Sequence, residues 1–261
     1  MKLWLNFKNV ENDTMEWLIF DVDGVLIDVS ESFDIAVKKT VETILKKFDE
    51  RIELELGQIR DLRKKGLFSN DFELSEALIL GKMEYEKIDD FVKEFPERET
   101  REWIKSVTNV YIGDETVKKI FNSYYFAEEY EYHLFDTKAI YKREKRIIDL
   151  DLIKKSEERF KIGIITGRDR KEMKLAEDII GYKFNNVITR DEVEKPNPNC
   201  LKQLLGSEEG IYIGDTETDR IMVERFNEIY KNHVEFYKVS EDRNVNGVLK
   251  KIMKEMVSGK A

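Results

Sequence analysis

The sequence has very few residues of the kinds that build disulfide scaffolds and histidine-rich metal sites. Its 261 residues include one cysteine, Cys200, and two histidines, His133 and His233. One cysteine excludes an internal disulfide framework, and two histidines make a multi-histidine metal site untenable. No apolar run is long enough for a signal peptide or a membrane span. We therefore expect a soluble, cytoplasmic protein.

The chain is rich in charged residues of both signs, with a moderate excess of acidic ones. Hydrophobic residues make up 41% of the chain and charged residues 38%, which allows a substantial core and argues against disorder. The net charge of −9 and the pI of about 5.1 argue against nucleic acid or an anionic membrane as the main partner. We expect a small-molecule partner and a monomer or homodimer.

Short, nearly continuous apolar runs predict buried strands at 16–22, 160–166, 185–189, 210–215 and 234–239. Stretches with helical periodicity lie between the last four of these runs, at 170–181, 198–205 and 216–230. Alternation of strand and helix is typical of βαβ units. The predicted fold class is therefore α/β, with a doubly wound parallel sheet.

A long segment after the first predicted strand has almost no strand signal. Helical patterns occupy 30–48, 72–95 and 114–130, and the chain returns to the sheet near the basic "KREKR" of 142–146. The expected division is a core of residues 1–28 and 143–261 and an all-helical insert of residues 29–142.

The stretch "FDVDGVL" (20–26) places two acids at the end of the first strand. Because side chains at i and i+2 of an extended chain point to the same side, Asp21 and Asp23 lie together there. Gly24 lets the backbone turn sharply and approach a ligand. Taken alone, the pattern also fits a simple turn whose aspartate caps the next helix.

Polar residues stand at other strand ends too. "IITGRDR" puts Thr166, Gly167 and Arg168 after the second strand of the core, where an ordinary turn with a solvated arginine is the simpler interpretation. Pro196 holds the preceding Lys195 in an extended conformation. Further along the chain, "IGDTETD" supplies the last two acids, Asp215 and Asp219. The carboxyl ends of parallel strands meet at one edge of the sheet, so these groups converge.

Four converging carboxylates repel one another. Each pair about 4 Å apart costs roughly 4 kcal/mol at an effective dielectric near 20. A divalent cation and Lys195 would relieve that cost, and all-oxygen ligands with open positions suit Mg²⁺. A carboxylate nucleophile, a second acid and positioned donors together suggest phosphoryl transfer.

The motifs "DVDGV", "TG", "KP" and "GDTETD" occur in this order. As a set they resemble the haloacid dehalogenase superfamily of phosphatases, whose fold is a Rossmann-like core with a helical cap. The resemblance implies that Asp21 is the nucleophile and Asp23 the general acid/base. It also implies that Thr166 binds the transferring phosphoryl group and that Lys195 stabilises nucleophile and phosphate.

The same resemblance implies a Mg²⁺ cofactor held by Asp21, the backbone carbonyl of Asp23, and Asp215, with Asp219 supporting through water or Lys195. Gly24, Gly167 and Arg168 are substrate-binding candidates beside them. The stretches 21–33 and 64–78 are similar to an uncharacterised subgroup related to histidine-biosynthesis enzymes. Phe33 and Asp34 depart from the Ser-Tyr-Arg continuation of that subgroup.

The loop "KKGLFSNDF" (64–72) admits two interpretations. It is either a surface loop followed by an Asn70 helix cap, or a loop of the insert that offers Lys64, Lys65 and Asn70 to the substrate. The leading functional hypothesis is a Mg²⁺-dependent phosphatase that acts on a small phosphomonoester. A phosphomutase of the same fold and a non-catalytic regulatory module are the alternatives.

Overall fold

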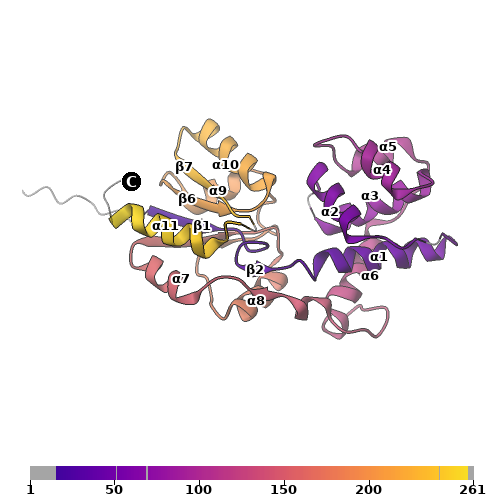
Figure 1. Ribbon diagram of the computed structural model, residues 1–261, viewed down its shortest axis with the longest axis horizontal. Helices are drawn as coiled ribbons and strands as arrows, with labels where there is room; N and C mark the ends of the chain where they lie inside the picture. Colours follow the sequence, from indigo (N-terminus) through magenta and orange to yellow (C-terminus); the bar gives the residue numbers. More distant parts are fainter. Residues whose placement is uncertain (1–15, 51, 69, 241, 258–261) are drawn as a thin grey trace, which may run out of the picture.

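A parallel sheet forms the centre of one lobe of the molecule (Figure 1). The computed structural model describes residues 16–50, 52–68, 70–240 and 242–257. In this part, five strands pair in the order β5-β4-β1-β6-β7, and every pairing is parallel. The strands are β1 (Glu16–Phe20), β4 (Phe160–Ile165), β5 (Val187–Ile188), β6 (Gly210–Gly214) and β7 (Val234–Lys238). This order brings the ends of β1, β4 and β6 side by side.

Helices cover both faces of the sheet. Leu18 and Phe20 of β1 pack in one apolar cluster with residues of α7 (Leu150–Glu157), α8 (Arg170–Ile180) and α11 (Val245–Val257). Trp17 and Ile19 point to the opposite face and pack with α9 (Asn199–Leu205) and α10 (Glu217–Tyr230). The alternation of side chains along a strand produces this division. The predicted doubly wound α/β fold is confirmed, and Cys200 is buried in the second cluster.

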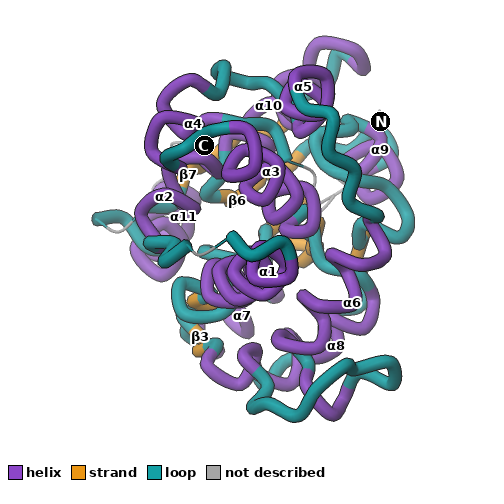
Figure 2. The backbone as a smooth tube through the Cα atoms, turned by 90° about the vertical axis from the view of Figure 1, so that its right-hand side faces the viewer, coloured by secondary structure: helices purple, strands orange, loops and turns teal. Residues whose placement is uncertain are grey.

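The second lobe is helical and lies between β1 and β4 in the sequence. Its helices are α1 (Phe33–Lys47), α2 (Leu56–Lys65), α3 (Asp71–Glu84), α4 (Ile88–Glu94), α5 (Arg101–Val107) and α6 (Asp114–Tyr125). They enclose a separate apolar core that includes Val41, Leu78 and Phe121. Figure 2 views the molecule from the side of this lobe, so its helices lie in front of the strands.

The chain leaves and re-enters the sheet lobe at neighbouring points. The short strand β2 (Ile27–Asp28) pairs antiparallel with β3 (Lys145–Arg146), and two 3₁₀ turns, Ala127–Glu129 and Ile140–Arg143, precede β3. The boundaries at residues 28/29 and 142/143 stay a prediction, and residues 1–15 of the predicted core lie outside the described residues.

Two predicted helices were wrong in extent. The helix predicted over 114–130 ends as α6 at Tyr125, and the 3₁₀ turn Ala127–Glu129 follows it. The segment 72–95 forms two helices, α3 and α4, because Phe91 folds back onto Gly81, where a Cβ would lie 2.4 Å from the Phe91 ring. The sequence patterns did not predict α2, α5, α7, α11 or the β2–β3 pair. None of the described helices combines the length and apolarity that a membrane crossing requires.

Candidate active site

Asp21 and Lys195 form a buried ion pair at the carboxyl end of the central strand. Asp21 follows β1 directly and is only 4% exposed. Its Oδ1 accepts a hydrogen bond from the Val22 N–H at 2.8 Å and lies 2.9 Å from the Lys195 Nζ. The Nζ also donates to Asp219 Oδ1 at 2.7 Å. One lysine therefore joins the residue after β1 to an acid of the segment that follows β6.

Asp219 is held by four hydrogen bonds. Its Oδ1 accepts from Lys195 and from the Tyr212 hydroxyl at 2.9 Å. Its Oδ2 accepts from the Thr216 N–H at 3.1 Å and from the Thr216 hydroxyl at 2.6 Å, which closes the capping box of α10. Burial opposes ionisation, yet Lys195 and these bonds lower the pKa of Asp219. The geometry makes Asp219 an ionised anchor for Lys195.

Asp215 has the opposite environment. Its Oδ1 is buried and has no hydrogen-bond partner among the described residues. Burial, followed by the charge of Asp219, raises the pKa of Asp215 to about 7. Gly24 has a φ of +73°, and a Cβ there would lie 2.3 Å from Asp215 Oδ2. Only glycine permits this approach between the Asp21–Asp23 turn and the acid after β6.

Carboxylate oxygens of Asp21, Asp215 and Asp219 lie within 4.8 Å of one another. Burial raises the pKa of Asp21 well above its usual range, with Asp219 and Asp215 adding to the effect and Lys195 opposing it. An orphaned buried oxygen on Asp215 and an excess of acids over Lys195 fit a hard divalent cation. We refer to Asp21, Asp215 and Asp219 as the acidic cluster.

Thr166 and Gly167 follow β4 beside this cluster. The Thr166 side chain is buried, and its Oγ1 accepts the Arg168 N–H at 3.1 Å. A Cβ added at Gly167 would meet no atom within 4 Å, so the space above this residue is open. The ends of β1, β4 and β6 thus supply a carboxylate, a hydroxyl and a second acid, and Lys195 comes from the segment between β5 and α9.

The comparisons agree with this geometry. Residues 15–227 match the family model of haloacid dehalogenase-like hydrolases. The chain belongs to this family. The phosphatase Tt82 from Thermococcus thioreducens is 40% identical, with a TM-score of 0.81 over 91% of this chain and 99% of that one. The chain is therefore an enzyme of the phosphatase type.

Two more distant solved structures share the fold. A proposed phosphoglycolate phosphatase from Lactobacillus delbrueckii subsp. bulgaricus is 17% identical, with a TM-score of 0.58 over 93% of this chain and 98% of that one. A hydrolase from Pseudomonas syringae is also 17% identical, with a TM-score of 0.51 over 92% and 98% of the two chains. No curated protein matches this chain.

Within this haloacid dehalogenase-like frame, Arg168 has an unexpected environment. It is 1% exposed, so the interpretation as a solvated charge was wrong. Its Nη2 lies 2.6 Å from Asp23 Oδ1 and 2.8 Å from Glu144 Oε2, and its Nε donates to Asp23 at 2.9 Å. The Tyr125 hydroxyl donates to the other Glu144 oxygen at 2.6 Å. The Arg168 guanidinium therefore donates its hydrogen bonds to carboxylates of the protein itself.

Arg168 also connects Asp23 to the helical insert. The Phe33 ring of α1 covers its guanidinium at 5.4 Å and stacks on Tyr125 of α6 at 4.9 Å. Phe33 is the position at which the sequence departs from the resembling subgroup. Glu144 and Tyr125 were not predicted from the sequence, because no local pattern marks a partner so distant in the chain.

The three insert residues that were predicted to contact substrate have different surroundings in the structure. Lys65 donates to the carbonyls of Val92 and Lys93 inside the insert, and Lys64 is exposed and has no ion pair among the described residues. Asn70 caps α3 by accepting from the N–H groups of Phe72 and Glu73. Its side chain also faces Glu194, the neighbour of Lys195, so this cap residue lies against the core.

Proposed function

We propose that this enzyme is a Mg²⁺-dependent phosphatase that hydrolyses a small phosphomonoester through an aspartyl-phosphate on Asp21. The observation that carries the proposal is the buried Asp21 carboxylate at the end of β1, fixed by Lys195 and flanked by Asp23 and Thr166. A carboxylate so placed serves as a nucleophile when a cation and a lysine neutralise the charge around it. The core of residues 1–28 and 143–261 would carry the chemistry, and the insert of residues 29–142 would cover it.

Each of the four core residues has its own role in the proposed reaction. An Asp21 oxygen attacks phosphorus, and the ester oxygen leaves with a proton from Asp23. Asp23 then takes a proton from the water that attacks the acyl phosphate, which releases phosphate and restores Asp21. The Thr166 hydroxyl donates to a phosphoryl oxygen, and the Lys195 ammonium offsets charge on nucleophile and phosphate.

Asp21, the Asp23 carbonyl and Asp215 would hold Mg²⁺, with Asp219 acting through Lys195 or a water. The bound ion would supply Lewis-acid stabilisation of the phosphoryl oxygens. The four hydrogen bonds already made by Asp219 favour this indirect role.

Removal of divalent cations is expected to stop the reaction. Hydrolysis of 4-nitrophenyl phosphate should fall by about 10² or more when EDTA is added, and recover when excess Mg²⁺ follows. Colorimetric assay of nitrophenol and of inorganic phosphate measures both products. An unchanged rate in EDTA contradicts the metal assignment, and nitrophenol without free phosphate contradicts hydrolysis.

Arg168 is proposed as a positioning residue that orients the Asp23 carboxyl group through the contacts of its Nε and Nη2. Arg168→Lys should lower kcat by about tenfold to a hundredfold with little change in KM, because proton transfer weakens while phosphate binding persists. The test is a double-mutant cycle with Asp23→Asn, measured below the unfolding temperature of each variant. In the Asp23→Asn background, Arg168→Lys should cause no further loss of kcat. If it lowers kcat there as much as it does in the wild type, Arg168 does not act through Asp23.

A further inference from the structure

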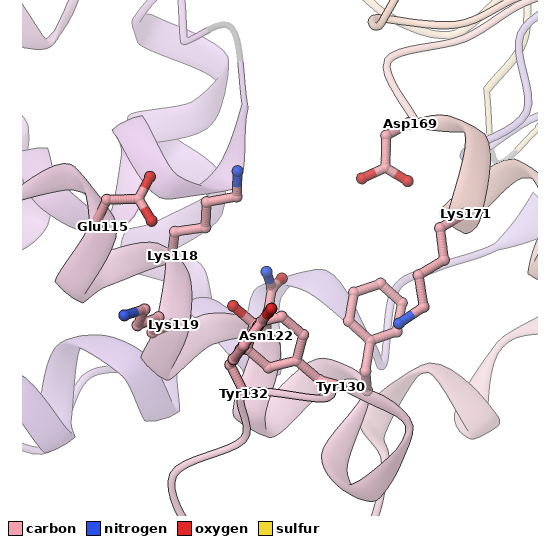
Figure 3. Close-up of a pocket in the computed structure, with 9 residues that line it drawn as sticks. Glu115, Lys118, Lys119, Asn122, Tyr130, Tyr132, Asp169 and Lys171 are labelled. Atoms are coloured by element: carbon pink, nitrogen blue, oxygen red, sulfur yellow. The ribbon is translucent and has the colours of Figure 1, made fainter.

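A groove of about 460 Å³ opens between the insert and the sheet lobe (Figure 3). Helix α6 provides one wall and the start of α8 the other, with aromatic side chains between them. Its lining residues are Glu115, Lys118, Lys119, Asn122, Phe126, Tyr130, Tyr132, Asp169 and Lys171. A smaller pocket of about 200 Å³ shares Glu115 and Lys118 with it and continues to Asn70.

The groove is flanked by the two segments that carry catalytic candidates. Asp169 caps α8 and stands three residues after Thr166. The smaller pocket that adjoins the groove reaches Asn70, whose side chain faces Glu194, the residue before Lys195. A substrate with its phosphate at Asp21 would therefore extend its remaining part toward this space.

Polar groups in the groove are left without partners. Asn122 is 7% exposed; its Oδ1 is a buried acceptor, and neither this oxygen nor the Nδ2 donor forms a hydrogen bond within the described part of the chain. Figure 3 shows its amide between Lys118 and Lys171. An anion cannot bond the Oδ1 acceptor, but the Nδ2 donor has no hydrogen-bond partner among the described residues and can donate to an anion in the groove. The Lys118 ammonium forms no ion pair among the described residues, so its donors are available.

The charged side chains that line the groove carry a net positive charge once their ion pairs are considered. Of its two acids, Asp169 is neutralised by Arg190 at 3.0 Å, which leaves Glu115 against three lysines. Lys171 donates to the Glu129 carbonyl at 2.9 Å and lies 4.4 Å from the centroid of the Phe126 ring. Its ammonium has three N–H donors, so further donors remain.

We propose that this groove binds a second anionic group of the substrate, a carboxylate or a second phosphate, through Lys118, Asn122 and Lys171. This inference rests on the proposed function and narrows its substrate class to phosphomonoesters with a charged leaving group. The aromatic side chains of Tyr130 and Tyr132 would pack against the connecting carbon atoms.

Matched substrate pairs test the proposal. 3-Phosphoglycerate differs from glycerol 3-phosphate by a carboxylate in place of a hydroxymethyl group, and fructose 1,6-bisphosphate differs from fructose 6-phosphate by a second phosphate. In the Mg²⁺-loaded wild type, kcat/KM should favour the more charged member of at least one pair. The pair that shows the preference tells which anion the groove accepts.

Lys118→Gln should reduce that preference by about tenfold, the usual effect of one charge-assisted hydrogen bond. Asn122→Leu should reduce it as well. Lys174→Gln is the matched control, because Lys174 is an exposed lysine of α8 outside the groove, and it should retain the wild-type ratio. Equal ratios in wild type and Lys118→Gln, or no preference in either pair, would overturn the proposal.

Failure of the subsite and failure of the proposed function are separable. Hydrolysis of 4-nitrophenyl phosphate without an effect of Lys118→Gln on either pair refutes only the subsite. If no ester is hydrolysed, the subsite can still be tested by measuring the binding of 3-phosphoglycerate and of fructose 1,6-bisphosphate calorimetrically in the presence of Mg²⁺. Weaker binding of either ligand by Lys118→Gln, by about tenfold, supports the subsite, and unchanged binding of both refutes it.

Discussion

Asp21→Asn is expected to abolish phosphate release, with a loss of kcat of about 10⁴-fold or more. An amide at this position has nearly the shape of the carboxylate but cannot attack phosphorus. The carbonyl oxygen of that amide can still accept from the Val22 N–H and from Lys195, the two bonds that Asp21 Oδ1 makes. The fold should therefore persist, and release of a buried acid from the cluster should leave thermal stability equal or higher.

The measurement is single-turnover and steady-state phosphate release from 4-nitrophenyl phosphate, with unfolding followed by circular dichroism. Asp28→Asn is the matched control: Asp28 is exposed, lies in the same segment, and accepts hydrogen bonds from Ser30. It should keep wild-type turnover. Robust turnover by Asp21→Asn would remove Asp21 as nucleophile, and trapped acyl phosphate on another residue would identify its replacement.

The sequence predicted the parts of the site that depend on strand ends. Asp21, Thr166 and Asp215 each follow a buried apolar run, and parallel pairing of β1, β4 and β6 brings such ends together without knowledge of side-chain packing. Lys195 was predictable for a similar reason, since Pro196 and the surrounding motif mark its loop. These inferences needed only periodicity and the topology of parallel sheets.

The contacts that connect the two lobes were not predictable in this way. The Arg168–Glu144 pair and its Tyr125 partner join residues from separate elements, and Asn70 with Glu194 does the same. Such contacts depend on how far the insert closes over the sheet, which hydrophobic periodicity does not specify. The break between α3 and α4 has the same origin, because it follows from the packing of Phe91 on Gly81.

Lys195→Met should weaken both stability and catalysis. Lys195 is the cation that pairs with Asp21 and Asp219, and its side chain is 9% exposed. Methionine has a similar length and fills the space, but it leaves buried carboxylates facing one another. Removing one partner of a buried pair typically costs about 3–5 kcal/mol. The expected loss in kcat is about 10²–10³-fold, since Lys195 stabilises charge on nucleophile and phosphate.

Thermal unfolding with and without Mg²⁺ separates the electrostatic cause from a packing defect. If repulsion within the acidic cluster destabilises Lys195→Met, Mg²⁺ should raise its Tm by more than it raises that of the wild type, because the ion replaces the missing positive charge. Lys183→Met, which alters an exposed lysine, should unfold like the wild type under both conditions. Equal Mg²⁺ shifts in Lys195→Met and wild type would mean that Lys195 does not offset the charge of the cation site. In that case Asp219, which Lys195 anchors, would lose its proposed indirect role as well.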